Sequence, residues 1–424
     1  MSSKTKTTAT KEEATPALVP KLRFPEFLDA EPWNNEVVED LLDESRTPSS
    51  QNDPSRRITV RLHLQGVEHR EHRGTESTES TNNFCRKAGQ FIYGKQNIHK
   101  GAFGIIPSHL HGFETSQDLP CFDFKDRCCS QWLYYHFARE AVYGPLELKM
   151  TGTGSKRLNE KSFLGLAIAA PTYPEQQKIA ECLSSVDELI AAQARKLDAL
   201  KTHKKWLMQQ LFPREGEIQP RLRFPEFQNA GNWEETRLGR LGELVSGLTY
   251  RPDDVRETGL LVLRSSNVQN GAISLDDCVY VDPDIKGANL SLPNDILICV
   301  RNGSAALIGK NALIPGGMPL CTHGAFMTVF RSKSAKFVFQ LFQTSKYQKQ
   351  VAGDLGATIN SINGSQLIKY KFVVPKPVEQ QKIADFLFSI DELVAAQAQK
   401  LAALKTHKKG LMQQLFPSPE VVET

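Results

Sequence analysis

The feature that most constrains this chain is an internal repeat of 43 residues. Pro171–Pro213 and Pro375–Pro417 align without a gap and are identical at 32 of 43 positions. A shorter repeat precedes each copy, because the string LRFPEF at Leu22–Phe27 recurs at Leu222–Phe227, followed each time by a tryptophan. The stretches in between resemble each other only faintly. This order indicates a duplication whose constant blocks stayed alike while the variable blocks diverged.

The constant blocks have the heptad pattern of a coiled coil. Apolar residues alternate at spacings of four and three, and no proline or glycine interrupts Glu175–Phe212. Each helix would be on the order of 55 Å long, so its apolar seam needs a partner. We expect the two copies to pair antiparallel about an internal pseudo-twofold axis, with Gln193 and Gln397 setting the register. Alternatively, each helix packs on its own neighbouring domain or on another chain. The predicted seam comprises Ile179, Leu183, Val186, Ile190, Leu197, Leu200, Leu207, Ile383, Leu387, Ile390, Val394, Leu401, Leu404 and Leu411.

The variable blocks have the pattern of mixed α/β domains. In the second block, apolar runs such as Ile296–Val300 and Phe326–Phe330 are bounded by turn residues and predict strands. Polar clusters follow these runs at Arg264–Asn267 and Arg301–Ser304, and a third lies at Thr358–Gly364. Such side chains contact base edges and phosphates, although each cluster alone also fits an ordinary turn.

These patterns predict an α+β fold in which two globular domains are joined by two long helices. The expected organisation is a disordered tail (1–20), a first recognition domain (21–170), a central helix (171–213), a second recognition domain (214–374), a distal helix (375–417) and a C-terminal tail (418–424).

Composition excludes several classes of protein. The net charge of +4 is only mildly basic and leaves the partner open. No apolar stretch approaches the roughly 18–20 residues that span a bilayer, and the polar N-terminus lacks a signal-peptide core. We therefore expect a cytoplasmic protein without a membrane partner. The eight cysteines include no CxxC pair, so we expect reduced thiols and no metal site.

Motifs for catalysis are missing from the sequence. The segment Gly303–Lys310 departs from the spacing of a phosphate-binding loop and lacks its Ser or Thr. No Asn/Asp-Pro-Pro-aromatic turn of a DNA methyltransferase occurs, and no carboxylates stand at nuclease spacing. We predict no catalytic residue and no cofactor in this chain.

The variable–constant plan and its strings resemble the specificity subunits of Type I restriction–modification systems. The strings include EQQKIA, LKTHKK, LMQQLFP and LRFPEF, together with FIYGKQN in the first half and RNGSAALIGK in the second. The resemblance covers roughly residues 21–417, and it is poor over 43–83. It implies two target recognition domains that each read one half of a bipartite, asymmetric DNA site. It also implies that the coiled coil sets the half-site spacing and docks two modification subunits.

The resemblance assigns the chemistry to other subunits. The modification subunits would use S-adenosylmethionine to methylate adenine, and restriction subunits would cleave DNA with ATP and Mg²⁺. From the resemblance and from position, the predicted contacts with double-stranded DNA are Lys95, Gln96, Asn97, Lys156, Arg157, Arg264, Ser265, Asn267, Arg301, Asn302, Ser304, Asn360 and Asn363. The alternatives are a scaffold that binds no DNA, built on the coiled coil, and an enzyme with its own catalytic domain, for which residues 1–33 leave no room.

Overall fold

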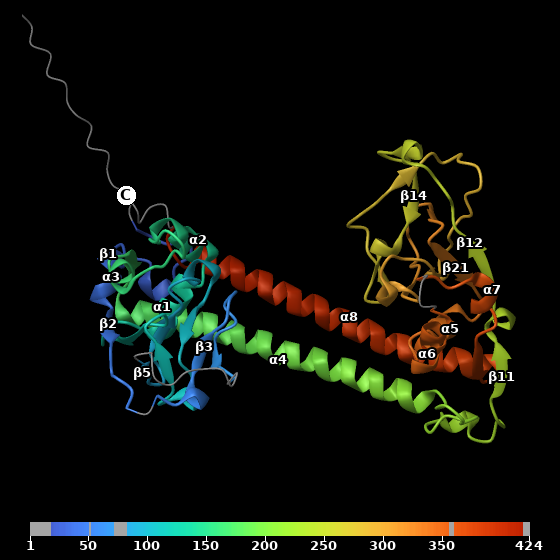
Figure 1. Cartoon of the computed structure of the whole chain (residues 1–424), viewed down its shortest axis with the longest axis horizontal. Helices are drawn as coiled ribbons and strands as arrows, with labels where there is room; N and C mark the ends of the chain where they lie inside the picture. The colour runs from blue at the N-terminus through green and yellow to red at the C-terminus, as the bar shows by residue number, and fades with distance from the viewer. Residues whose placement is uncertain (1–17, 51, 72–82, 356–359, 419–424) are drawn as a thin grey trace, which may run out of the picture. The chain divides into compact units, whose positions relative to one another are not determined.

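A computed structural model of the chain describes residues 18–50, 52–71, 83–355 and 360–418. The chain divides into two compact units, of which unit 1 comprises residues 1–194 and 400–424 and unit 2 comprises residues 195–399. The predicted α+β class, with two globular domains and two long helices, is confirmed (Figure 1). The unit boundaries fall within the long helices, so each unit contains one globular domain and part of each helix.

Unit 1 is built on a four-stranded antiparallel sheet in the order β2-β9-β6-β7. Its central strand β6 is wholly buried, and the Phe91 ring of this strand stacks on Phe163 with centroids 5.7 Å apart. The pairs β1–β10, β3–β4 and β5–β8 and three short helices surround it. The elements are β1 (Asn34–Val37), β2 (Leu42–Ser45), β3 (Ile58–Val60), β4 (Val67–His69), β5 (Asn83–Cys85), β6 (Phe91–Tyr93), β7 (Phe103–Ile105), β8 (Glu114–Ser116), β9 (Cys121–Phe124), α1 (Ser130–Phe137), α2 (Glu140–Tyr143), α3 (Glu160–Leu164) and β10 (Ala167–Ala170).

Unit 2 repeats this sheet with the order β12-β21-β18-β19 and repeats the pair β1–β10 as β11–β22. It adds a four-stranded sheet, β13-β17-β14-β20, whose β14 and β20 are parallel. The remaining strands of unit 1 form only two-stranded pairs within the described residues, so the variable blocks differ here. The elements are β11 (Glu234–Arg237), β12 (Glu243–Ser246), β13 (Val255–Arg256), β14 (Leu260–Leu263), β15 (Val268–Gln269), β16 (Ala272–Ile273), β17 (Tyr280–Val281), β18 (Ile296–Cys299), β19 (Asn311–Leu313), β20 (Cys321–His323), β21 (Met327–Arg331), α5 (Ala335–Leu341), α6 (Ser345–Asp354), α7 (Gly364–Leu367) and β22 (Lys371–Val374).

The long helices are α4 (Tyr173–Leu211) and α8 (Pro377–Gln414), coloured green and red in Figure 1. In unit 1 the early part of α4 meets the late part of α8, where Lys408 Nζ lies 2.7 Å from Asp187 Oδ1. In unit 2 the late part of α4 meets the early part of α8, where Lys204 Nζ lies 2.5 Å from Asp391 Oδ1. The helices therefore pack antiparallel in each unit, as predicted. The register role of the two glutamines stays a prediction.

A globular domain also contacts each interhelical ion pair. In unit 1, the phenol of Tyr135 on α1 donates to Asp187 Oδ2 (2.7 Å), and Lys408 Nζ lies 5.0 Å from the Tyr135 ring centroid. Burial raises the pKa of Tyr135, which keeps this phenol protonated as a donor. In unit 2, the amide of Gln340 on α5 donates to Asp391 Oδ2 (3.1 Å). Each domain is thus tied to the helix pair within its own unit.

The repeated LRFPEF…W motif docks on the start of a long helix. In unit 1, Arg23 donates to both carboxylate oxygens of Glu175 (2.8 Å each), and Trp33 Nε1 donates to Oε1 (3.2 Å). In unit 2, Arg223 donates to both oxygens of Glu379 (2.7 Å each), and Trp233 Nε1 donates to Oε1 (3.2 Å). Both carboxylates are buried. The repeated motif therefore forms the same Arg–Glu–Trp contact in both units, and we call this contact the lock.

The predicted N-terminal tail is too long by three residues. The carbonyl of Leu18 accepts from Trp33 N–H (2.9 Å), and Pro20 is buried, so Leu18–Pro20 belong to unit 1. Residues 1–17 and 419–424, which fall in the predicted tails, lie outside the described residues. None of the helices in the described part of the chain combines the length and apolar character that a membrane crossing requires.

We expect unit 1 to lose stability as the pH falls below about 6.5, the ordinary pKa of histidine. The buried His136 accepts a hydrogen bond at Nδ1 from Arg139 (3.1 Å), and burial together with Arg139 lowers its pKa well below that value. Below this pH the imidazole is protonated in the unfolded chain but stays neutral in the folded chain. The free energy of unfolding therefore falls by at most about 1.4 kcal/mol per pH unit. Urea unfolding at pH 7.5 and 5.5 measures this loss. His136→Gln should flatten the pH dependence, whereas His203→Gln at an exposed site should leave it unchanged.

Candidate nucleic-acid interface

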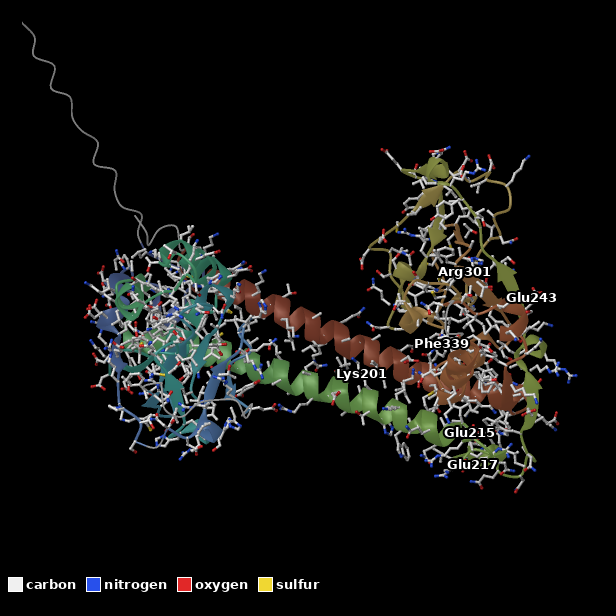
Figure 2. All side chains as sticks on the ribbon, viewed as in Figure 1. Lys201, Glu215, Glu217, Glu243, Arg301 and Phe339 are labelled. Atoms are coloured by element: carbon white, nitrogen blue, oxygen red, sulfur yellow. The ribbon has the colours of Figure 1, made fainter. Side chains whose placement is uncertain are left out.

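Three loops of unit 2 that are far apart in the sequence meet at one surface. Asn302, after β18, donates from Nδ2 to Ser265 Oγ of the loop after β14 (3.1 Å). The N–H of Asn302 donates to the carbonyl of Asn360 (3.3 Å). In return, the side-chain amide of Asn360 donates to the carbonyl of Gly303 (2.9 Å). Figure 2 labels Arg301 in the globular part of this unit. The structure therefore brings together polar clusters that the sequence shows only as separate segments.

The predicted contact residues of unit 2 differ in how far they face solvent. Arg301 and Ser304 are exposed. Arg264 is partly exposed and lies 2.7 Å from Asp277 in an ion pair. Asn363 is exposed, but its Oδ1 accepts from Ser365 N–H (3.1 Å) and caps α7. Apart from Asn363, Arg301 and Ser304 are therefore the members most open to solvent, whereas Arg264, Ser265, Asn302 and Asn360 are partly exposed.

Asn267 is a structural residue, so its prediction as a DNA contact is wrong. Its side chain is 0% exposed. Its Oδ1 accepts from Arg264 N–H (2.8 Å), and its Nδ2 donates to the carbonyls of Ser274 (3.0 Å) and Asp277 (2.9 Å). These bonds fix the conformation of the loop that carries Arg264. Asn267 therefore stabilises this surface without being part of it.

Unit 1 brings its two predicted segments together in the same way. The N–H of Leu158, next to Arg157, donates to the carbonyl of Lys95 (2.9 Å). Lys95 Nζ lies 2.7 Å from Glu160, so this ammonium is already paired. Gln96 and Lys156 are exposed, and Asn97 is partly buried in the turn. Among the predicted contacts of unit 1 that the structure describes, Gln96, Lys156 and Arg157 are therefore the ones whose side chains face solvent.

The two surfaces share a backbone frame and differ in their side chains. In unit 1 the N–H of Lys95 donates to the carbonyl of Asp118 (3.0 Å), and in unit 2 the N–H of its counterpart Val300 donates to the carbonyl of Phe326 (3.0 Å). Asp118 forms an ion pair with Arg157 (3.6 Å), whereas the Phe326 ring lies under the Arg301 guanidinium. One scaffold thus presents two unlike sets of groups.

Phe326 was missed as a surface residue by the sequence analysis. It opens the apolar run that predicts a strand, but β21 begins only at Met327 and the Phe326 side chain is 58% exposed. Neither apolar character nor spacing distinguishes it from the buried residues that follow. The carbonyl of Phe326 accepts from the N–H groups of Val300 and Arg301, and these bonds fix the backbone of Phe326.

A second exposed surface lies on the long helices, and we call it the helix flank. It follows one side of the predicted seam and is identical in the two helices except at its last position. Leu189 and Leu393 are 58% and 53% exposed, and Trp206 is 50% exposed and stacks on His203 with centroids 5.8 Å apart. These apolar side chains are exposed and are available for contact with a partner. The flank comprises Ser185, Leu189, Ala192, Lys196, Ala199, His203 and Trp206 of α4 and Ser389, Leu393, Ala396, Lys400, Ala403, His407 and Gly410 of α8.

Comparison with known proteins gives a consistent result. A family model described as the Type I restriction modification DNA specificity domain matches residues 47–202 and again residues 230–406. The chain is 25% identical over 293 residues to the specificity subunit of the type I restriction enzyme MjaVIII of Methanocaldococcus jannaschii, covering 67% of this chain and 69% of that one. It is 27% identical over 173 residues to the EcoKI specificity subunit of Escherichia coli, covering 38% and 36%.

Solved structures are similar in fold. The crystal structure of the Type I restriction–modification S subunit from M. genitalium superposes with a TM-score of 0.59 at 16% identity. The superposition covers 94% of this chain and 99% of that chain. At this identity the likeness concerns the fold, which has the two-domain, two-helix plan described above.

Proposed function

The chain belongs to the family of type I restriction modification DNA specificity domains, and on this premise we propose how it recognises DNA. It is a sequence-specific DNA-binding specificity subunit of a type I restriction–modification complex. In the proposal, each unit reads one half of a bipartite, asymmetric site. The paired helices set the number of unread base pairs between the halves.

The observation that carries this proposal is the common backbone frame with unlike side chains. Lys95 and Val300 make the same backbone bond, to Asp118 and Phe326, yet Asp118 is ion-paired with Arg157 whereas the Phe326 ring lies under Arg301. A shared frame places both loops alike toward a duplex, while different donors select different bases. Two unlike half-sites are what such a pair of surfaces would recognise.

The chemistry is proposed to belong to partner subunits. Two modification subunits would methylate adenine with S-adenosylmethionine, and restriction subunits would cleave DNA with ATP and Mg²⁺. In this proposal the chain contributes recognition and assembly, and it holds no cofactor of its own.

We assign the helix flank to the docking of the modification subunits. The flank occurs once on each long helix, so its occupant should bind in two copies, one for each half-site. Leu393, His203 and Trp206 lie in unit 2, and their counterparts Leu189, His407 and Gly410 lie in unit 1. Identity at exposed positions serves no packing need of the helix pair, which supports a contact with a common partner.

A salt titration tests DNA binding. The full chain with its modification subunit should bind a duplex whose sequence is taken from the methylated sites of host DNA. The logarithm of its affinity should fall linearly with the logarithm of salt concentration, at about 0.9 per phosphate contacted. If no salt-dependent binding to any duplex is detected, the result would instead support a scaffold that binds no DNA.

Lys156→Ala should weaken binding to all duplexes alike. Lys156 is exposed on the unit 1 surface, and a lysine there contacts phosphate as a point charge. The salt slope should fall by about one, with the order of preferred sequences unchanged. Gel-shift titration at several salt concentrations measures both, and a changed order of preference would show that Lys156 contacts a base.

A further inference from the structure

An exposed arginine and an exposed aromatic ring form a pair on the unit 2 surface. The guanidinium carbon of Arg301 lies 5.8 Å from the centroid of the Phe326 ring. Both side chains are exposed. An aromatic ring left this far in water contributes little to the core. Its exposure beside a cation therefore points to a role on the surface.

The backbone holds this pair from two sides. The N–H groups of Val300 and Arg301 both donate to the carbonyl of Phe326 (3.0 and 3.1 Å). On the other side, Ile362 N–H donates to the carbonyl of Val300 (2.8 Å), and the backbones of Arg301 and Ser361 form an isolated antiparallel β-bridge. The Cα positions of both residues are thus set before any ligand binds. A guanidinium that rests on a ring also loses less freedom when it forms hydrogen bonds.

The equivalent position in unit 1 shows that the pair is not required by the fold. There Lys95, the counterpart of Val300, makes the corresponding backbone bond to Asp118, and Gln96 stands at the position of Arg301. The same frame therefore forms with a glutamine and an aspartate in place of an arginine and a phenylalanine. The difference concerns what the surface presents.

We infer that Arg301 and Phe326 together read a guanine and an adjacent thymine in the half-site of unit 2. An arginine donates two parallel hydrogen bonds to the O6 and N7 of guanine, and a phenylalanine packs on the thymine 5-methyl group. The ring, which lies against the guanidinium, would contact the neighbouring base. This inference rests on the proposed function of the surface.

Modified duplexes test each contact separately. The full chain with its modification subunit is titrated with the natural target, with 7-deazaguanine at single guanines, and with uracil at single thymines. At one guanine, 7-deazaguanine should weaken binding about 3–10-fold for the wild type, and not for Arg301→Ala. At the adjacent thymine, uracil should weaken binding about 3–5-fold for the wild type, and not for Phe326→Ala.

Methylation of host DNA gives an independent readout. Arg301→Ala should reduce discrimination at that guanine about 5–150-fold, with the other half-site unaffected. Phe326→Leu should retain the preference for thymine, because it keeps an apolar side chain, whereas Phe326→Ala should lose it. Leu320→Ala, at another exposed apolar residue of unit 2, should change neither.

The outcomes separate this inference from the proposed function. If Phe326→Ala weakens thymine and uracil duplexes equally, or if the unit 2 half-site has no guanine–thymine step, the inference is wrong while DNA reading stands. If neither half-site shows any sequence preference, the proposed function itself fails.

Discussion

Glu379→Ala is expected to lower the free energy of unfolding of unit 2 by about 3–5 kcal/mol. The buried carboxylate accepts both bonds from Arg223 and one from Trp233 Nε1. This pairing raises the pKa of Arg223, mainly through the hydrogen bond to Glu379. Because the intrinsic pKa of arginine is above about 12, the guanidinium stays charged when its partner is removed. A buried, unpaired cation is then left at the start of α8. Urea unfolding followed by tryptophan fluorescence measures the loss.

Three variants separate this lock from a general effect of mutating α8. Glu392→Ala, on the exposed face of the same helix, should change stability by less than about 0.5 kcal/mol. The double variant Arg223→Met with Glu379→Leu should recover much of the loss, because it removes both charges. Glu175→Ala should reproduce the effect in unit 1, where Arg23 and Trp33 make the same bonds. A loss below 1 kcal/mol for Glu379→Ala would contradict the lock.

Trp206→Ala is expected to weaken the tighter of two binding steps for the modification subunit by about 10–100-fold. Trp206 is half exposed and is held by His203, so it is a preordered aromatic anchor. Its counterpart on α8 is Gly410, and the two flanks are otherwise identical. Because one flank has the anchor and the other lacks it, the two copies of the partner should bind with unequal affinity. Calorimetric titration of the full chain with the modification subunit resolves the two steps.

The reciprocal variant makes this prediction sharper. A side chain added at Gly410 meets nothing within 4 Å, so Gly410→Trp should fold and should tighten the weaker step. Lys201→Ala, outside the flank on α4, should leave both steps unchanged. Two equal steps in the wild type, or equal effects of Trp206→Ala and Lys201→Ala, would exclude the assigned flank. Binding of the modification subunit that is lost in every variant would point to misfolding, which the unfolding measurements detect.

The long helices were predictable because their pattern is local. Heptad spacing between Ile179 and Leu207 and its repeat on the second helix identify each helix and its apolar side. Lys204 and Lys408, which also lie on these helices, were not assigned partners. Their carboxylates, Asp391 and Asp187, lie on the other helix, and only the antiparallel register brings them within 3 Å.

The candidate site was only partly predictable. Polar clusters such as Arg301–Ser304 could be recognised from composition, but a polar residue in a loop is equally able to face solvent or to brace the loop. Asn267 braces its loop, and Phe326, at the edge of an apolar run, faces solvent. Both outcomes depend on hydrogen bonds to residues in other loops, which no local pattern encodes.

By itself the sequence determined the duplication, the two helices with their apolar seam, and the resemblance to a family. These properties depend on residues within a few turns of one another, or on direct identity between copies. Only the tertiary structure decided which loops meet, which carboxylate receives Arg23 and Trp33, and which side chains reach the surface. Those contacts join residues more than 30 positions apart in the chain. Their energies depend on burial and distance, which exist only once the chain has folded.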